Sequence, residues 1–182
     1  MKRLINSLAL AGCLVAFAGI GPSALADGTI AGTVKFDGRM AKPKKIRVSG
    51  DVFCVKARAE DPLLRETYLF KTLLNVLVYV SDGVGAAPAA PSEPVEMTQE
   101  GCQYLPHVSA VMVGQKLKIK NDDDTAHNLN LKPEKNSPFY EGQPVKGMVK
   151  EVVFGTPELA MPLKCDVHSW MSAWVHVLDN PY

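Results

Sequence analysis

The sequence has no excess of charge of either sign, no internal repeat and no apolar run long enough to cross a membrane. Its 182 residues include 20 lysines and arginines against 19 aspartates and glutamates, which gives a net charge of +1. Proteins that bind nucleic acid through its phosphates need a basic excess, so we do not expect nucleic acid as a partner. A hydrophobic content of 47% with 21% charged residues argues against disorder and favours one globular domain.

The apolar run near the N-terminus is typical of a signal peptide. Lys2 and Arg3 precede an apolar stretch over residues 8–20, which is shorter than the ~20 apolar residues of a membrane span. Small residues before Asp27 form a cleavage site, so we expect residues 1–26 to be removed on export to the periplasm, leaving no membrane span. Loss of the two basic residues leaves 18 against 19 acidic ones, a charge of −1.

An alternative processing site lies at Cys13. Residues 10–13 read Leu-Ala-Gly-Cys and resemble the box at which bacterial lipoproteins are cleaved and lipidated. A lipid-anchored cysteine is normally followed by a polar tether, whereas the apolar run continues here through residues 14–17. We therefore favour cleavage after Ala26 over a lipoprotein, and over a retained membrane anchor.

Cysteine is scarce. Of the four cysteines, Cys13 leaves with the signal peptide, so an odd number enters an oxidising compartment. The simplest arrangement pairs Cys54 with Cys102 and leaves Cys165 for another task. This pairing is a hypothesis, which alkylation of all three thiols in the unreduced protein would overturn.

Helical periodicity is nearly absent, and short alternating segments dominate the chain. A helix is expected only at residues 59–66, with Asp61 as its N-cap and Pro62 at its first position. Residues 83–94 read as a surface connection within one domain, and residues 132–147 as irregular. The expected strands cover residues 28–36, 72–80, 108–113, 116–120, 127–131, 149–154, 159–165 and 174–178. Strands at this spacing indicate an all-β sandwich or barrel.

The densest group of chemically reactive side chains lies at residues 165–171, which read Cys-Asp-Val-His-Ser-Trp-Met. Soft sulfur ligands beside an imidazole favour copper over zinc, magnesium or calcium. A second imidazole would complete the His2Cys plane with a weak axial methionine that defines a blue-copper electron-transfer site. The candidate is His127, which follows the Asn/Asp turn at residues 121–124; the alternative is an ordinary loop histidine.

This pattern resembles that of the cupredoxins, the small blue copper proteins that include plastocyanin, azurin and amicyanin. Their shared motif is an Asn-rich turn with a His, here at residues 121–127, and a Cys-His-Met loop about forty residues later. The two-residue gaps on either side of His168 are most similar to those of amicyanin. A more specific resemblance is to exported bacterial plastocyanin-like proteins, which share Gly-Cys-x-Tyr-x-Pro-His-Val at residues 101–108 and Cys-Asp-Val-His-x-Trp-Met-x-Ala-x-Val at residues 165–175.

The resemblance implies a cupredoxin-like Greek-key β-sandwich or barrel. Residues 27–182 then form a single domain, with an N-terminal β elaboration over residues 27–94 and a copper-site half over residues 95–182. The smallest cupredoxins have no counterpart of the elaboration. The resemblance also implies one type 1 copper per chain, held by His127, Cys165, His168 and Met171.

Further roles follow from the same resemblance. Asn128 is expected to hydrogen-bond near the cysteine loop and to restrain it, which tunes the potential. The position of His168 on an exposed loop, taken by itself, makes it the expected exit for the electron. Trp170 beside it is either a packing residue or an exposed apolar docking point for a redox partner, and we favour the second. That partner would be a cytochrome or another periplasmic oxidoreductase.

The expected function is a periplasmic type 1 copper protein that carries single electrons, and not an enzyme. Two alternatives stay open. The first is a periplasmic copper carrier or storage protein in copper homeostasis, which would use the same ligands. The second is a metal-free exported β-sandwich scaffold module.

Other candidate ligands are interpreted as structural. His107 is expected to be structural or on the surface, and His176 to face outward from the last strand. Residues 122–124 lack the spacing of a calcium-binding EF-hand and are expected to form a solvated turn. Zinc is disfavoured because methionine is a poor zinc ligand, and a binuclear copper centre would need a second cysteine in the loop.

Overall fold

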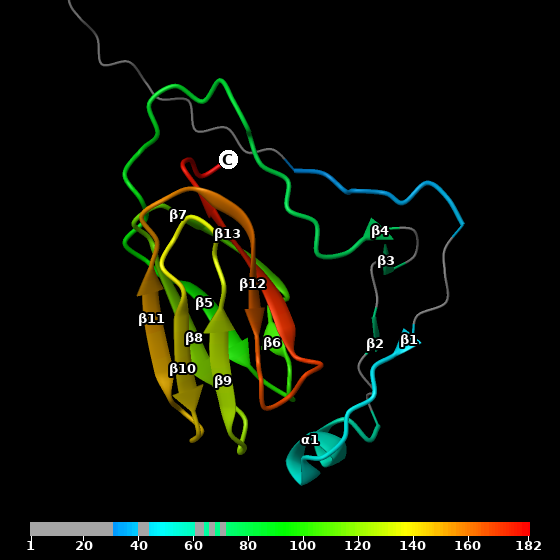
Figure 1. Cartoon of the computed structure of the whole chain (residues 1–182). Helices are drawn as coiled ribbons and strands as arrows, with labels where there is room; N and C mark the ends of the chain where they lie inside the picture. Colours follow the sequence, from blue (N-terminus) through cyan, green and yellow to red (C-terminus); the bar gives the residue numbers. More distant parts are fainter. Residues whose placement is uncertain (1–30, 40–43, 61–63, 66–67, 70–71) are drawn as a thin grey trace, which may run out of the picture. The chain divides into compact units, whose positions relative to one another are not determined.

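The computed structural model describes residues 31–39, 44–60, 64–65, 68–69 and 72–182 (Figure 1). The expected signal peptide and its cleavage site lie outside these residues. None of the helices in the described ranges is long and apolar enough to cross a membrane. Thr33–Tyr182 form one unit of the chain, which contains both sheets and every expected ligand.

Two mixed β-sheets contain most of the described strands of this unit. The larger sheet has five strands in the order β10 (Phe139–Gln143), β9 (His127–Leu131), β12 (Glu158–Lys164), β13 (Ser172–Leu178) and β7 (Val108–Met112). The smaller sheet has four strands in the order β11 (Val149–Val153), β8 (Lys116–Asn121), β5 (Val95–Gln99) and β6 (Tyr104–Leu105). Within the sheets, β13 with β7 and β5 with β8 pair in parallel, and the other pairs are antiparallel.

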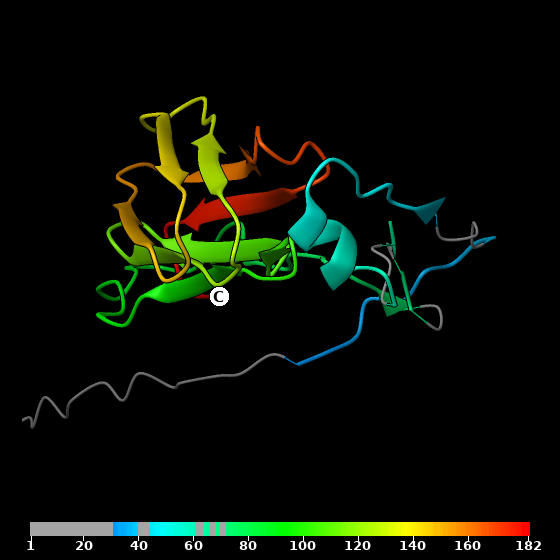
Figure 2. The ribbon, with the colours of Figure 1, turned by 90° about the horizontal axis from the view of Figure 1, so that it is seen from below.

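The sheets form an all-β Greek-key sandwich, as the sequence predicts (Figure 2). Alternating side chains on β8 and β13 explain why they pack: Leu117 and Ile119 are buried on β8, and Val175 and Val177 on β13. These side chains belong to one hydrophobic core between the sheets. The chain passes from β8 to β9 and β10, then to β11, and returns to β12 and β13, so that β12 lies between β9 and β13.

Among its described residues, the segment before Val95 contains one helix and four two-residue strands. Helix α1 spans Val52–Ala57, and the strands are β1 (Lys44–Lys45), β2 (Leu64–Arg65), β3 (Tyr68–Leu69) and β4 (Thr72–Leu73). The predicted helix at residues 59–66 is wrong where the structure describes it, because Leu64–Arg65 pair with β1 as a strand. Asp61 and Pro62 lie outside the described residues. The helix begins instead after Asp51, whose side chain accepts a hydrogen bond from Cys54 N and caps it.

Two predicted strands are much shorter in the structure. Within residues 72–80 only β4 is a strand, because Asn75 adopts a left-handed backbone conformation (φ 57°) and the chain bends. Val76 and Val78 beyond it are exposed, so the apolar residues there do not mark a buried strand. Within residues 31–36 the structure has a single bridge, from Lys35 to Thr72, and residues 28–30 lie outside the described ranges.

In the two large sheets, three strands were not predicted. Strand β10 lies inside the segment that was expected to be irregular, and it pairs residue by residue with β9. Strand β5 pairs in parallel with β8 and buries Met97 and Gln99, and β6 pairs with β5. Polar and glycine residues weaken the alternation of β5 and β10, which are strands because their neighbours pair with them.

Candidate metal centre

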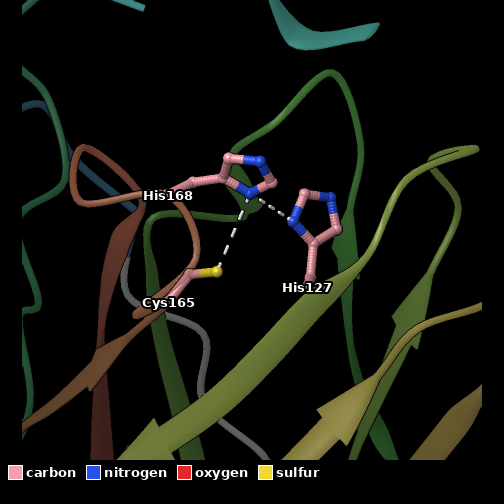
Figure 3. Close-up of side chains that lie close together, drawn as sticks. All are labelled: His127, Cys165 and His168. Carbon is pink, nitrogen blue, oxygen red and sulfur yellow. Dashed lines mark hydrogen bonds between the residues drawn. The ribbon is translucent and has the colours of Figure 1, made fainter. Parts of the chain in front are cut away.

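The candidate ligands come from strand β9 of the larger sheet and from the loop between β12 and β13. His127 is the first residue of β9, Cys165 directly follows β12, and His168 lies in the loop. Figure 3 shows the three side chains pointing toward one another. The Nδ1 atoms of His127 and His168 lie 2.9 Å apart, and Cys165 Sγ lies 3.9 Å from Nδ1 of His168. All three residues are at most 3% exposed.

Backbone hydrogen bonds close the ligand loop. Cys165 N donates to Met171 O at 3.2 Å, and Met171 N donates to His168 O at 2.9 Å. Met171 is buried, with 1% of its surface exposed. The loop therefore holds its cysteine and histidine in fixed positions and turns the methionine into the protein interior.

Asn128 connects β9 to the ligand loop. Its Oδ1 accepts hydrogen bonds from Asp166 N at 2.7 Å and from Val167 N at 3.3 Å, and Cys165 Sγ lies 3.4 Å away. Its Nδ2 donates to the Asp166 carboxylate at 3.2 Å. The Asn128 side chain thus accepts hydrogen bonds from two backbone N–H groups of the ligand loop and also contacts the sulfur of Cys165.

Asp123 contacts the other side of His127. The imidazole Nε2 lies 2.9 Å from Asp123 Oδ2, and both oxygens also accept backbone hydrogen bonds, from Gly101 N at 2.6 Å and Cys102 N at 2.7 Å. Gly101 and Cys102 both have left-handed backbone conformations, which turn their successive N–H groups toward one anion. Asp123 is only 2% exposed, so the prediction of a solvated turn is wrong at this residue. The Asp123 carboxylate can be buried because it makes three hydrogen bonds, to His127 Nε2, Gly101 N and Cys102 N.

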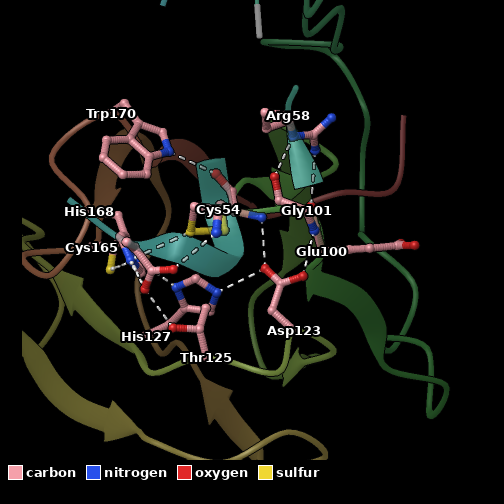
Figure 4. The surroundings of a disulfide bond; sticks show 12 residues. Cys54, Arg58, Glu100, Gly101, Asp123, Thr125, His127, Cys165, His168 and Trp170 are labelled. Carbon is pink, nitrogen blue, oxygen red and sulfur yellow. Dashed lines mark hydrogen bonds and ion pairs between the residues drawn. A yellow bond between two sulfur atoms is a disulfide. The ribbon is translucent and has the colours of Figure 1, made fainter. Parts of the chain in front are cut away.

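The N-terminal segment covers His168. Cys54 and Cys102 form the disulfide that the cysteine count predicts, and it ties α1 to the loop before β6 (Figure 4). His168 Nε2 lies 3.1 Å from Asp51 Oδ2 and 3.6 Å from Cys54 Sγ. The imidazole is 2% exposed, so the expectation that His168 presents an exposed edge is wrong. The residues at the start of α1 therefore lie against its Nε2 edge.

Trp170 lies against the same region. Its ring centroid is 5.0 Å from that of His168, and its Nε1 donates a hydrogen bond to Cys102 O at 3.1 Å. The side chain is half-buried, so it packs on the disulfide loop and keeps part of its surface accessible. The structure does not bring the remaining two histidines to the site. His176 lies on the outer face of β13 and accepts from Ala160 N, while His107 is half-buried ahead of β7.

The charges of the site are coupled. Burial alone would lower the pKa of His127, but its hydrogen bonds and the nearby charges of Asp123 and Cys165 raise that pKa to about 9. Burial lowers the pKa of His168, and the charge on His127 lowers it further, against the effect of Asp51. Burial raises the pKa of the Cys165 thiol, but the hydrogen bonds from His127 and from the backbone of Asn128 and His168, with the charge on His127, together outweigh burial and lower the net pKa. Cationic His127 therefore donates from Nδ1 to neutral His168.

The donor set fits copper. Within the described ranges, three groups of side chains converge closely enough to hold a metal ion, and two of them include a disulfide cysteine, which is no thiolate donor. The third group is His127, Cys165 and His168, whose ligand atoms lie within 4.8 Å of one another. One thiolate and two imidazoles in a buried pocket are the equatorial ligands of a blue-copper site.

Sequence reasoning missed Asp51 and Asp123, the two carboxylates that contact the far nitrogens of the imidazoles. For Asp123, the position four residues before His127 was an available signal, but the neighbouring aspartates made it look like part of a solvated turn. No sequence signal connects Asp51 to His168, because their contact spans 117 positions.

No protein-family profile matches the chain, and no curated protein sequence matches it. Similar solved structures include the copper-containing nitrite reductase from Thermus scotoductus SA-01, with 21% identity and a TM-score of 0.45 over 53% of this chain, which spans 25% of that reductase. Another is a purple cupredoxin from Nitrosopumilus maritimus, with 20% identity and a TM-score of 0.40, covering 46% of this chain and 99% of that one. A third is an amicyanin variant in its reduced Cu(I) form, with 17% identity and a TM-score of 0.42, covering 48% and 85%. The purple cupredoxin belongs, by its name, to the family that residues 165–171 resemble.

Proposed function

We propose that this protein is an exported type 1 copper protein that carries single electrons between periplasmic redox partners. The observation that supports the proposal most is the convergence of Cys165 Sγ with the Nδ1 atoms of His127 and His168 in one buried pocket. Met171 is the proposed fourth ligand. These four residues would hold one copper ion, and copper held by them would supply one-electron transfer.

The rigidity of the site favours electron transfer over copper delivery. A carrier has to pass its ion to a partner, for which accessible ligands are required, whereas Cys165 and the two histidines are at most 3% exposed. Asn128 and the backbone bonds of the loop hold the ligands in place. A site that moves little between two oxidation states is suited to fast electron exchange.

The proposed docking surface for a partner consists of Trp170 and Val167, which lie on the ligand loop. Val167 is 57% exposed, and Trp170 is half-buried with its ring next to that of His168. Together they offer an apolar contact on the loop that holds the ligands. We expect Trp170→Ala to slow electron transfer to a partner while leaving the visible spectrum unchanged.

The test is the visible spectrum of the exported protein after loading with Cu(II). We expect an intense thiolate-to-copper band, which Cys165→Ser abolishes and Met171→Gln keeps at an altered reduction potential. A copper-loaded sample without that band would end the proposal. Slow electron self-exchange combined with rapid loss of copper to a chelator would instead indicate the carrier.

A further inference from the structure

The imidazole of His168 has two different neighbours at its two nitrogens. Nδ1 faces Cys165 and His127, the other members of the candidate centre. Nε2 faces the carboxylate of Asp51, which precedes α1 and lies outside both sheets. With 2% of the His168 side chain exposed, this carboxylate takes the place that water would occupy on an open histidine edge.

Asp51 is held in one position by its own contacts. Oδ1 accepts from Cys54 N at 3.0 Å and caps α1, and Oδ2 accepts from Thr125 Oγ1 at 2.7 Å in addition to His168. The Cys54–Cys102 disulfide and the hydrogen bond from Arg58 Nε to Gly101 O tie the helix to the domain. Figure 4 shows the hydrogen bond between Arg58 and Gly101 beside the disulfide. A carboxylate that is fixed in this way orients its partner.

We propose that Asp51 is the positioning residue of His168 and that it lowers the reduction potential of the copper centre, an inference that rests on the proposed function. When His168 Nε2–H donates to Asp51, the lone pair of Nδ1 is directed at the metal. A carboxylate acceptor also makes the imidazole a stronger donor, and the added negative charge stabilises Cu(II) more than Cu(I). The N-terminal segment thereby becomes part of the metal centre.

The distances exclude the other neighbours of Nε2 from this role. The disulfide sulfur of Cys54 lies 3.6 Å from Nε2 and is a weak acceptor, whereas Asp51 Oδ2 lies at 3.1 Å. Thr125 donates its hydroxyl hydrogen to Asp51 and so supports the carboxylate. Asp123 faces His127 in the same manner, but it also binds Gly101 N and Cys102 N, so its removal would disturb the loop as well.

The experiment replaces Asp51 in the full exported protein and measures two properties. Asp51→Asn keeps an oxygen for the helix cap but offers an N–H group to His168 and Thr125, so a donor faces a donor. We expect nitrogen NMR of the metal-free variant to show a shifted His168 Nε2 resonance, because the Nε2–H group loses its carboxylate acceptor. In the copper-loaded variant we expect the blue band to remain, the Cu(II) affinity to fall about 10- to 100-fold and the reduction potential to rise.

Three further variants separate positioning from structure. Asp51→Glu keeps the carboxylate and should return the potential toward the wild-type value, whereas Asp51→Ser keeps a cap but cannot reach His168 and should behave as the Asn variant does. Glu100→Gln removes one negative charge from an exposed side chain next to Gly101 and Cys102. It should change neither the NMR signal of His168 nor the reduction potential.

An unchanged Nε2 resonance and an unchanged potential in both Asp51→Asn and Asp51→Ser would overturn the inference while leaving the proposed function intact. An equal rise in potential in Glu100→Gln would also overturn it, because charge alone would then account for the effect. If the wild-type protein shows no blue band with Cu(II), the proposed function and the effect on potential both fail. The Nε2 resonance of His168 in the metal-free protein then decides by itself whether Asp51 holds this imidazole.

Discussion

The Nδ1 atoms of His127 and His168 lie 2.9 Å apart, although 41 residues separate the two histidines in the chain. Two lone pairs cannot face each other at this distance, so one nitrogen carries a proton. That nitrogen belongs to His127, whose pKa is raised to about 9, while the pKa of His168 is lowered. The metal-free protein thus keeps the two imidazoles in place with a proton in the position of the ion.

Metal binding should therefore release this proton. At pH 7.5 the His127 imidazole is protonated, so we expect at least one proton to be released per bound ion, and the affinity to rise about tenfold per pH unit for each proton displaced. Calorimetric titration with Co(II), which does not oxidise the thiol, in buffers of different ionisation heat measures the release. His127→Gln is the control and should release fewer protons. Binding without proton release at pH 7.5 would contradict the assignment.

Removal of the Asn128 side chain should loosen the ligand loop. Asn128→Ala leaves the backbone N–H groups of Asp166 and Val167 without their acceptor, which should lower the free energy of unfolding by about 1–3 kcal/mol. We also expect a broadened thiolate-to-copper band, because the sulfur of Cys165 loses its neighbour. Urea unfolding and the visible spectrum measure the two effects.

The matched control is Asn130→Ala. Asn130 donates to the same Asp166 carboxylate, at 2.9 Å, but it is half-buried and contacts neither the loop backbone nor the sulfur. Asn130→Ala should lower the free energy of unfolding by less than about 1 kcal/mol and leave the thiolate-to-copper band unchanged. If both variants behave alike, Asn128 acts only through Asp166 and has no specific role in the loop.

From the sequence, the β-sandwich could be predicted at those strands whose residue pattern is set by burial alone. Strands β8 and β13 alternate strictly because one face of each packs on the core, and the pattern at residues 116–120 and 174–178 reveals this directly. Strand β10 has no such pattern, since its order comes from pairing with β9, with Gln143 opposite His127. Pairing partners that are distant in the sequence leave no periodic signal.

The candidate site, too, could be predicted from the sequence only in part. The three converging side chains follow from a compact motif and one upstream histidine, and the structure brings them together. The contact of Asp51 with His168 could not be predicted, because it depends on where α1 is fastened by a disulfide that spans 48 positions. The predicted exposure of His168 failed for this reason.

The disulfide should matter for stability and for potential. With 48 positions between the cysteines, the chain-entropy estimate gives about 4 kcal/mol of stability lost in a Cys54→Ala, Cys102→Ala double variant. Because α1 is then free to leave, Asp51 loses its contact with His168, and the potential should shift in the same direction as in Asp51→Asn. Thermal unfolding and voltammetry check both expectations. Val55→Ala, on the exposed side of α1, should leave the potential unchanged, and an unshifted potential in the double variant would show that Asp51 is held without the disulfide.

Glu158 should make stability depend on pH in the acid range. This buried carboxylate accepts hydrogen bonds from the backbone N–H groups of Glu134, Lys135 and Asn136. Burial raises its pKa, but these bonds outweigh burial and the net pKa is lowered from 4.5. The folded state then binds fewer protons than the unfolded state, so the stabilisation is complete above pH ~5 and disappears as the pH falls through the folded pKa.

Glu158→Gln removes the charge and keeps one acceptor. We expect it to lower the free energy of unfolding by about 1–3 kcal/mol at pH 7, because charge-assisted hydrogen bonds to three backbone donors become neutral ones or are lost. The difference from wild type should be smaller at pH 3 than at pH 7, because protonation of wild-type Glu158 removes its charge as the pH falls. The control is Glu151→Gln, which breaks the exposed ion pair with Lys116 and should cost less than about 1 kcal/mol. Urea unfolding at both pH values decides the point, since an equal loss at pH 7 and pH 3 would mean that the bonds are made by a neutral carboxyl group.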